Sequence, residues 1–273
     1  METSKKASLW TLIILTAIIV LICCMIPRIP QPQSYHLFAD RRSFRGIPNF
    51  GDVVSNLPFA MVGIWGLVFL LRSATVFLDR REIWAYLIAF AGLLLTAFGS
   101  SYYHLAPDNA RLVWDRLPMT ITFMAMVAAV IAERINVRLG IWLLPILLLV
   151  GFASVWQWYW SETRGAGDLR FYAAVQAYSA LVVLLALFFP PRYTRGSDFG
   201  LVLGFYALAK VLELFDISIF RALHIVSGHT LKHVAAAAAG FFILRMLQKR
   251  KPVPSSYSAR TGNPPRVEMN LPV

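Results

Sequence analysis

The sequence contains little cysteine, little charge and few acidic residues. Only 2 of its 273 residues are cysteine, and 15% are charged. The two cysteines, Cys23 and Cys24, are adjacent in an apolar run. Adjacent cysteines exclude a disulfide framework and do not have the spacing of a cysteine metal site. We expect them to be small residues that face lipid or a neighbouring helix.

Several motifs that mark common enzyme classes are also absent. The sequence has no His-Glu-x-x-His motif, which excludes the zincin mechanism. It has no Gly-rich phosphate loop and no Gly-x-Ser-x-Gly elbow. No internal repeat is visible, so a transporter built from repeats is not supported.

Hydrophobic residues dominate the composition. They make up 58% of the chain, and the mean hydropathy is +0.61. A bilayer is spanned by about 17–25 apolar residues. Eight such windows can be read from the sequence: 9–27, 52–72, 84–104, 117–133, 139–160, 171–190, 199–217 and 229–247. The sequence therefore predicts an all-α, polytopic transmembrane helix bundle.

The eight windows divide the chain unevenly. We expect an extra N-terminal span and loop in residues 1–35, a seven-span core in 36–250 and a disordered tail in 251–273. Residues 1–27 resemble a signal peptide but lack a small-x-small cleavage site, so a retained span is predicted. The tail is rich in Pro, Ser and Asn, which is typical of disorder.

Basic residues outnumber acidic ones, 26 to 14, for a formal net charge of +12. In a membrane protein this excess sets topology and does not indicate nucleic-acid binding. The densest basic cluster, residues 245–251, follows the last span and is predicted to be cytoplasmic. An even number of spans then places both termini in the cytoplasm. The loop with Arg41, Arg42 and Arg45 departs from this rule.

Three of the five histidines occupy corresponding ends of predicted spans. His104 ends window 84–104, and His229 and His233 begin window 229–247. Residues four apart share a helix face, and the predicted topology brings all three to the non-cytoplasmic side. Three imidazoles with an open fourth position form a catalytic zinc site. The alternative is that each is an ordinary interfacial histidine.

Two other polar residues belong to the same predicted end of the bundle. Ser100 lies one helical turn before His104, and Asp115 precedes window 117–133. Ser100 has an alternative role in helix packing. Asp115 has an alternative role as a helix N-terminal charge, or as a partner of Arg111 or Arg116.

A polar stripe and an aromatic cluster are also visible. Lys210, Glu213 and Asp216 recur every three residues. A Lys210–Glu213 ion pair is expected, because intramembrane charges usually pair, and Asp216 is expected to support the metal site. The aromatic cluster is predicted to be an interfacial belt rather than a ligand site, and its members are Trp156, Trp158, Tyr159 and Trp160.

Together, these motifs resemble the alkaline ceramidase family, part of a larger group that includes the adiponectin receptors. The similar segments, spread over residues 36–247, are 52–59 (DVVSNLPF), 98–104 (FGSSYYH), 115–119 (DRLPM) and 228–233 (GHTLKH). Their order and spacing carry the resemblance more than any one of them.

The resemblance implies a zinc-dependent amidase that cleaves ceramide-like lipids into a fatty acid and an amine. By this resemblance His104, His229 and His233 hold zinc, which polarises the amide carbonyl and activates water. Asp115 is expected to act as the general base, and Ser100 to stabilise the oxyanion. The expected partners are the lipid amide and membrane lipids.

Two departures from the family pattern limit what the resemblance implies. The span 9–27 is additional. The eukaryotic members also carry an acidic calcium-binding cluster, whereas this chain offers Asp40, Asn49 and Asp52 among three arginines. Calcium prefers several carboxylate or carbonyl oxygens, so the sequence gives it little support. A non-catalytic zinc-containing receptor or structural protein is the alternative function, disfavoured by the small size of the 28–51 loop and the tail.

Overall fold

A computed structural model describes residues 2–73 and 77–254. Its α-helices are α1 (Glu2–Met25), α2 (Phe50–Val54), α3 (Leu57–Arg72), α4 (Ile83–Leu105), α5 (Asn109–Arg134), α6 (Val137–Thr163), α7 (Arg170–Leu185), α8 (Asp198–Leu214), α9 (Asp216–Leu223) and α10 (Gly228–Lys249). The described residues also include two short 3-10 helices, η1 (Gln33–His36) and η3 (Arg80–Glu82). The described ranges contain no strand, only two isolated β-bridges. The predicted all-α bundle is confirmed, while most of the predicted disordered tail lies outside the described residues.

The structure is that of a multi-pass integral membrane protein. Six helical segments are long and apolar enough to cross a membrane: Thr3–Met25, Phe50–Arg72, Arg80–Leu105, Asn109–Arg134, Val137–Thr163 and Gly228–Lys249. The two remaining predicted windows coincide with α7 and α8, which have 16 and 17 residues. Both are slightly shorter than a typical span of about 20 residues.

Two of the predicted spans are interrupted. Window 52–72 is divided between α2 and α3, because Pro58 lacks an N–H and its ring conflicts with the preceding turn. The side chain of Asn56 donates to the carbonyl of Asp52 at 2.8 Å at this break. Window 199–217 ends early, because α8 stops at Leu214 and Asp216 begins α9. The predicted stripe of Lys210, Glu213 and Asp216 on one helix was therefore wrong for its last member.

Side-chain caps fix where α5, α6 and α10 begin, and the cap of α6 is Asn136. Asp108 accepts from the backbone of Arg111 at 2.7 Å at the start of α5. Ser227 accepts from the backbone of Thr230 at 3.0 Å at the start of α10. Such caps satisfy backbone N–H groups that have no partner inside the helix. The Ser227 cap fixes the first turn of α10, which carries His229.

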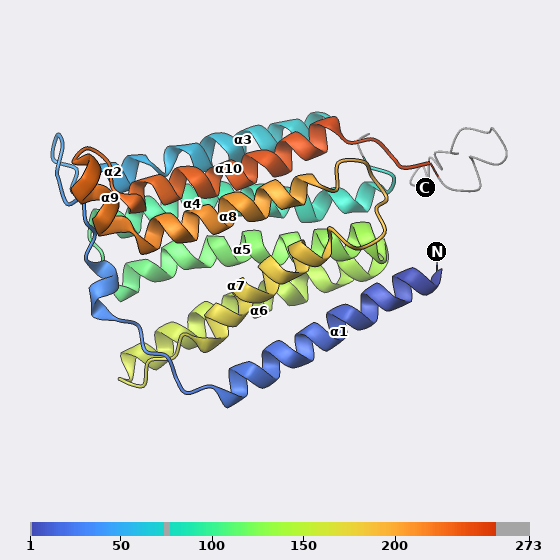
Figure 1. The fold of residues 1–273 in the computed structure, drawn as a ribbon, viewed down its shortest axis with the longest axis horizontal. Helices are drawn as coiled ribbons and strands as arrows, with labels where there is room; N and C mark the ends of the chain where they lie inside the picture. Colours follow the sequence, from blue (N-terminus) through green and yellow to red (C-terminus); the bar gives the residue numbers. More distant parts are fainter. Residues whose placement is uncertain (1, 74–76, 255–273) are drawn as a thin grey trace.

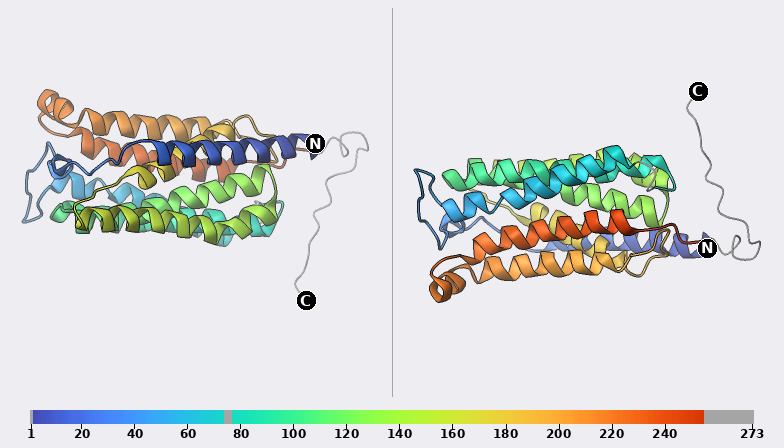
Figure 2. Two further views of the ribbon diagram at one scale, coloured as in Figure 1. Left: turned by 90° about the horizontal axis from the view of Figure 1, so that it is seen from below. Right: turned by 90° about the horizontal axis from the view of Figure 1, so that it is seen from above.

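The long helices run side by side along one bundle axis (Figures 1 and 2). Within it, α5 packs between α4 and α6, and α10 packs against α8 and α3. Helix α1 is peripheral and packs along α7. Its contacts with the core include a 3.1 Å hydrogen bond between the hydroxyls of Thr16 and Tyr178. Helix α1 therefore lies at the edge of the bundle, while the predicted division into one extra span and a seven-span core stays a prediction.

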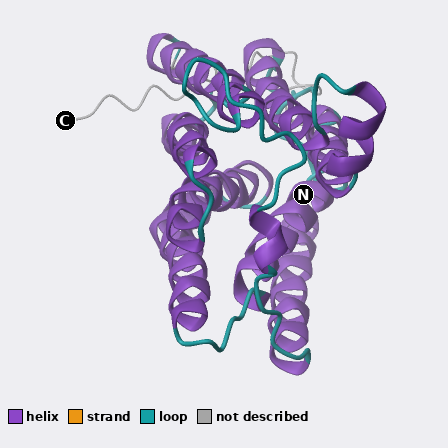
Figure 3. Cartoon of the chain, turned by 90° about the vertical axis from the view of Figure 1, so that its left-hand side faces the viewer, coloured by secondary structure: helices purple, strands orange, loops and turns teal. Residues whose placement is uncertain are grey.

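The start of α1 and the end of α10 lie at the same end of the bundle, while α2 and α9 lie at the other (Figure 1). Figure 3 looks along the bundle from this second end, where loops cross between the helix ends. We call it the capped end. It contains the C-terminus of α4 and the N-termini of α5 and α10, which carry the histidines predicted to bind zinc.

Gly99 allows α4 and α5 to approach closely beside these residues. A Cβ atom at this position would overlap the carbonyl oxygen of Trp114. We expect Gly99→Ala to destabilise the protein by about 1–3 kcal/mol, because the backbones must separate to admit the methyl group. Loss of folded protein on heating in detergent measures the effect.

Gly200→Ala is the matched control, because a Cβ atom on Gly200 meets nothing within 4 Å. This variant should melt close to the wild type. If the Gly99→Ala variant also melted at the temperature of the wild type, the α4–α5 contact would not be tight.

Candidate metal centre

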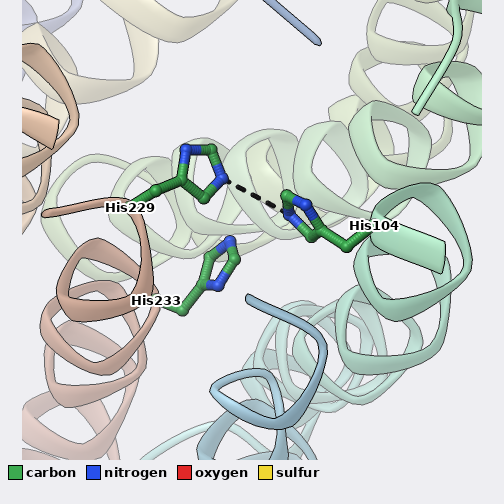
Figure 4. A group of neighbouring side chains, drawn as sticks. All are labelled: His104, His229 and His233. Atoms are coloured by element: carbon green, nitrogen blue, oxygen red, sulfur yellow. Dashed lines mark hydrogen bonds between the residues drawn. The ribbon is translucent and has the colours of Figure 1, made fainter. Parts of the chain in front are cut away.

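His104, His229 and His233 converge at the capped end. All three side chains are buried, and their ligand atoms lie within 4.8 Å of one another. The rings point toward a common centre from α4 and α10 (Figure 4). The Nε2 atoms of His104 and His229 are 3.3 Å apart. A tetrahedral zinc with Zn–N bonds of about 2.0–2.1 Å sets its nitrogen ligands about 3.3 Å apart, so this pair fits the ion.

Ser55 orients the third ring. Its Oγ lies 2.8 Å from Nδ1 of His233 and donates its own proton to the carbonyl of Asp52 at 3.1 Å. Because the hydroxyl proton is used in this way, the oxygen accepts from Nδ1–H of His233. The proton on Nδ1 leaves the Nε2 lone pair of His233 free for a metal. The donor set is thus three nitrogens, as in catalytic zinc sites.

We expect Ser55→Ala to weaken zinc binding by about 10–100-fold, the usual effect of removing a group that orients a metal-binding histidine. Competition with a chelator of known affinity measures the change. Ser154→Ala is a matched control, because this buried serine on α6 bonds only its own helix, at the carbonyl of Gly151. Equal zinc affinity in the two variants would show that Ser55 does not orient the ring.

Phe38, in the loop before α2, packs against two of the three rings. Its ring centroid lies 4.6 Å from that of His104 and 4.4 Å from that of His229. Asp216 holds this loop to the start of α10, because its carboxylate accepts from the backbone N–H of Ala39 at 3.0 Å and of His229 at 2.7 Å. Asp216 thus contacts the main chain of His229, and its role in supporting a metal site stays a prediction.

Arg42 fixes the same loop to the segment between α9 and α10. It forms an ion pair with Asp40 at 2.7 Å and donates to the carbonyls of His224 and Ile225 at 3.1 and 2.8 Å. The Arg42 guanidinium holds the pKa of the Asp40 carboxyl below its usual value. The carboxylate of Asp40 is therefore paired with Arg42 in this structure.

Ser100 and Asp115 adjoin the histidines on the inner side. Ser100 is 1% exposed on α4, and its side chain lies beside the carboxylate of Asp115 on α5. Together with His233 they line a cavity of about 540 Å³. Both predicted residues therefore lie where the sequence placed them. Asp115 is half-buried because it faces this cavity.

The cavity extends from these polar groups into the bundle. Its deeper lining is apolar and includes Leu93, Met126, Val183 and Ile243 from four different helices. Met126 lies 11 residues beyond Asp115 on α5, about 16 Å along a helix axis at 1.5 Å per residue. A cavity with polar groups at one end and an apolar interior fits an amphiphile with a hydrocarbon chain.

Glu213 joins two lysines beside the metal centre. It accepts from Lys210 at 3.1 Å and from Lys232 at 2.5 Å, and the hydroxyl of Tyr35 is 3.3 Å away. The predicted Lys210–Glu213 pair is confirmed. Lys232 was missed, although its position between His229 and His233 places it beside the site.

Asp52 is a second polar residue beside the site, which the sequence analysis considered only as a calcium ligand. It is fully buried, and its Oδ1 accepts from Thr230 at 2.8 Å and from Ser227 at 3.4 Å. These bonds link α2 to the first turn of α10. Asp52 and Ser55 were both visible in the 52–59 segment, but no spacing rule distinguished them from helix-packing residues.

Trp158 corrects the prediction of an aromatic belt. Trp156 and Trp160 are 56% and 48% exposed, as expected, but Trp158 is completely buried. Its indole packs against the guanidinium of Arg116, whose carbon lies 4.0 Å from the ring centroid. The prediction was wrong for Trp158 because neighbours two apart on a helix point to opposite sides, and this side faces α5.

The described residues thus combine three histidines that could hold a metal ion, an adjoining serine–aspartate pair and an apolar cavity in one membrane helix bundle. Neither protein-family models nor curated proteins provide a match to this chain. Its function must therefore be inferred from the chemistry of the site.

Proposed function

We propose that the protein is a zinc-dependent integral-membrane amidase of the alkaline ceramidase type, which hydrolyses lipid amides to a fatty acid and an amine. The observation that carries the proposal is the cavity, which joins His233, Ser100 and Asp115 to an apolar interior. The three-histidine cluster alone fits a structural metal. A deep apolar space beside it adds room for a substrate.

The chain's own residues supply binding and proton transfer. His104, His229 and His233 would hold zinc, which when bound polarises a carbonyl and lowers the pKa of water. Asp115, beside Ser100 at the cavity wall, would take the proton from the attacking water and return it to the departing amine. An amine leaves readily only when protonated, so one carboxylate serves both halves of the reaction.

Ser100 and the cavity would position the scissile amide. The Ser100 hydroxyl, on α4, lies beside Asp115. From there it could donate to the carbonyl oxygen of the amide as negative charge develops on that oxygen. The acyl chain would occupy the apolar interior between α5, α7, α8 and α10. Phe38 packs against His104 and His229, where it would limit the access of water from the capped end.

We further propose that the capped end faces away from the cytoplasm. The start of α1 and the end of α10 lie at the opposite end, next to the basic residues Lys249 and Lys251 (Figure 1). Basic residues favour the cytoplasmic side. Reporter fusions at residue 273 and in the 28–51 loop should report cytoplasmic and external locations. An external C-terminus would reverse the orientation.

The proposed function is tested by incubating purified protein in detergent micelles with a panel of lipid amides. Free fatty acid and free amine should both appear, in equal amounts. A strong chelator should stop the release, and zinc should restore it. No release of either product from any lipid amide by zinc-loaded protein would exclude the amidase and favour the non-catalytic alternative.

A further inference from the structure

Arg116 is a buried cation without an acidic partner. It is 4% exposed, and no carboxylate among the described residues forms an ion pair with it. Its Nη2 donates to the amide oxygen of Gln31 at 2.5 Å, while Nη1 has no hydrogen-bond partner. A buried charge without a counter-charge costs free energy, so arginines in such positions usually serve a ligand or an interface.

Aromatic rings hold this guanidinium in place. Its central carbon lies 4.0 Å from the ring centroid of Trp158, 4.6 Å from that of Tyr172 and 5.6 Å from that of Tyr35. Cation–π contacts offset part of the cost of burial but do not satisfy the N–H groups. The side chain is therefore fixed in orientation while one of its donors remains free.

Arg116 belongs to the wall of the substrate cavity. Tyr35, Tyr172 and Leu169 line the same region of the wall. Arg116 follows Asp115 directly, and adjacent helical residues point about 100° apart, as 3.6 residues per turn requires. Asp115 faces Ser100 on α4, while Arg116 faces α6 and α7. Asp115 and Arg116 thus present their charged groups to different parts of the same cavity wall.

Cationic side chains outnumber acidic ones in the lining of the cavity. Arg116, Lys210 and Lys232 are cationic, whereas Asp115 and Glu213 are acidic. Glu213 is paired with both lysines, and Asp115 interacts with Ser100. The lining therefore carries one more positive charge than negative charges, and Arg116 is the one of these three cations that forms no ion pair among the described residues. A single ligand carboxylate would neutralise it, and a guanidinium binds a carboxylate well through two parallel N–H bonds.

We propose that Arg116 recognises a carboxylate on the amine side of the lipid amide, so that the preferred substrates are N-acyl amino acids. This inference rests on the proposed function and assigns its substrate class. The acyl chain enters the apolar interior, the amide lies at His233, Ser100 and Asp115, and the carboxylate lies at Arg116. A neutral sphingoid head group would leave the guanidinium without a counter-charge.

Three substrates with one acyl chain test this assignment: N-palmitoylglycine, N-palmitoylethanolamine and its phosphate ester. We expect kcat/KM for N-palmitoylglycine to exceed that for the neutral ethanolamine by about 10–100-fold, the usual strength of a charge-assisted hydrogen bond. Preference for the neutral lipid, or no preference, would overturn the proposal. Preference for the phosphate ester would overturn the assignment to a carboxylate.

Arg116→Gln should lower kcat/KM for N-palmitoylglycine by about 10–100-fold and leave the neutral lipid within about threefold. Arg116→Lys keeps the charge but lacks the planar guanidinium with its two parallel N–H donors, so we expect an intermediate decrease in kcat/KM for N-palmitoylglycine. Arg164→Gln is the matched control: Arg164 also packs on a tryptophan, 3.7 Å from the ring centroid of Trp160, but is exposed and lies outside the cavity. If Arg116→Gln lowers kcat/KM equally for both lipids, Arg116 has only a structural role and the proposal fails.

Equilibrium binding separates failure of this inference from failure of the proposed function. If zinc-loaded wild type hydrolyses none of the lipids, the amidase proposal fails. Binding of radiolabelled N-palmitoylglycine and N-palmitoylethanolamine to the same protein still tests Arg116. Tighter binding of the carboxylate lipid that is lost in Arg116→Gln and kept in Arg164→Gln supports the recognition site. Equal binding of the two lipids to the wild type contradicts it.

Discussion

His229→Ala should remove zinc from the protein and abolish lipid-amide hydrolysis. Purified wild type should carry about one zinc per chain, the number that one three-histidine site holds. His229 contributes one of three nitrogens, and its Nε2 lies 3.3 Å from that of His104. With two nitrogens left, zinc loses a ligand that no neighbouring sulfur or carboxylate in the cluster replaces. Metal analysis of detergent-purified protein measures the loss directly.

Single alanine variants of His104 and His233 should behave in the same way. His224→Asn is the control, because His224 is exposed at the end of α9 and adopts a left-handed backbone conformation, φ 59°, that asparagine tolerates. This variant should retain zinc and activity. Full zinc content in all three alanine variants would show that the metal, if present, is bound elsewhere.

Asp115→Asn should retain zinc but lower the hydrolysis rate by about 10²–10⁴-fold, the usual contribution of general acid–base catalysis. The amide keeps the shape of the carboxylate and its contact with Ser100, but it cannot accept the proton from water. Zinc content and initial rates of fatty-acid release, measured on the same preparation, separate binding from catalysis. Loss of zinc in this variant would instead make Asp115 part of the metal site.

Ser100→Ala provides the comparison for Asp115→Asn. It should also spare the metal, and loss of one donor to a developing oxyanion costs about 10²–10³-fold in rate. Full activity of both variants with zinc retained would mean that the carboxylate is only a helix-end charge and the serine only a packing residue. The amidase mechanism would then have to be abandoned.

The sequence was sufficient to predict the helical architecture and the three histidines. Membrane-length apolar windows mark helices because lipid leaves no other partner for backbone N–H and C=O groups. The i,i+4 spacing of His229 and His233 places both on one helix face. Successive spans run in opposite directions, so the end of window 84–104, with His104, is predicted at the same end of the bundle as the start of window 229–247. These inferences use only periodicity and length, which a single sequence displays.

The residues that complete the site were not predictable in this way. Ser55 reaches His233 only because the chain breaks between α2 and α3, and Trp158 reaches Arg116 only because α6 packs against α5. Such contacts depend on the angle and register between helices, which periodicity does not specify. The break before Asp216 was missed for a similar reason, since no proline or glycine marks it.

The most direct test of the central claim is X-ray absorption at the zinc edge of the purified wild-type protein. Three histidines at one zinc predict a first shell of nitrogen and oxygen at about 2.0–2.1 Å, with the outer-shell scattering of imidazole rings and no sulfur. Fits should require about three imidazoles per zinc in the wild type. A shell containing sulfur at about 2.3 Å, or one without imidazole scattering, would contradict a metal centre formed by His104, His229 and His233.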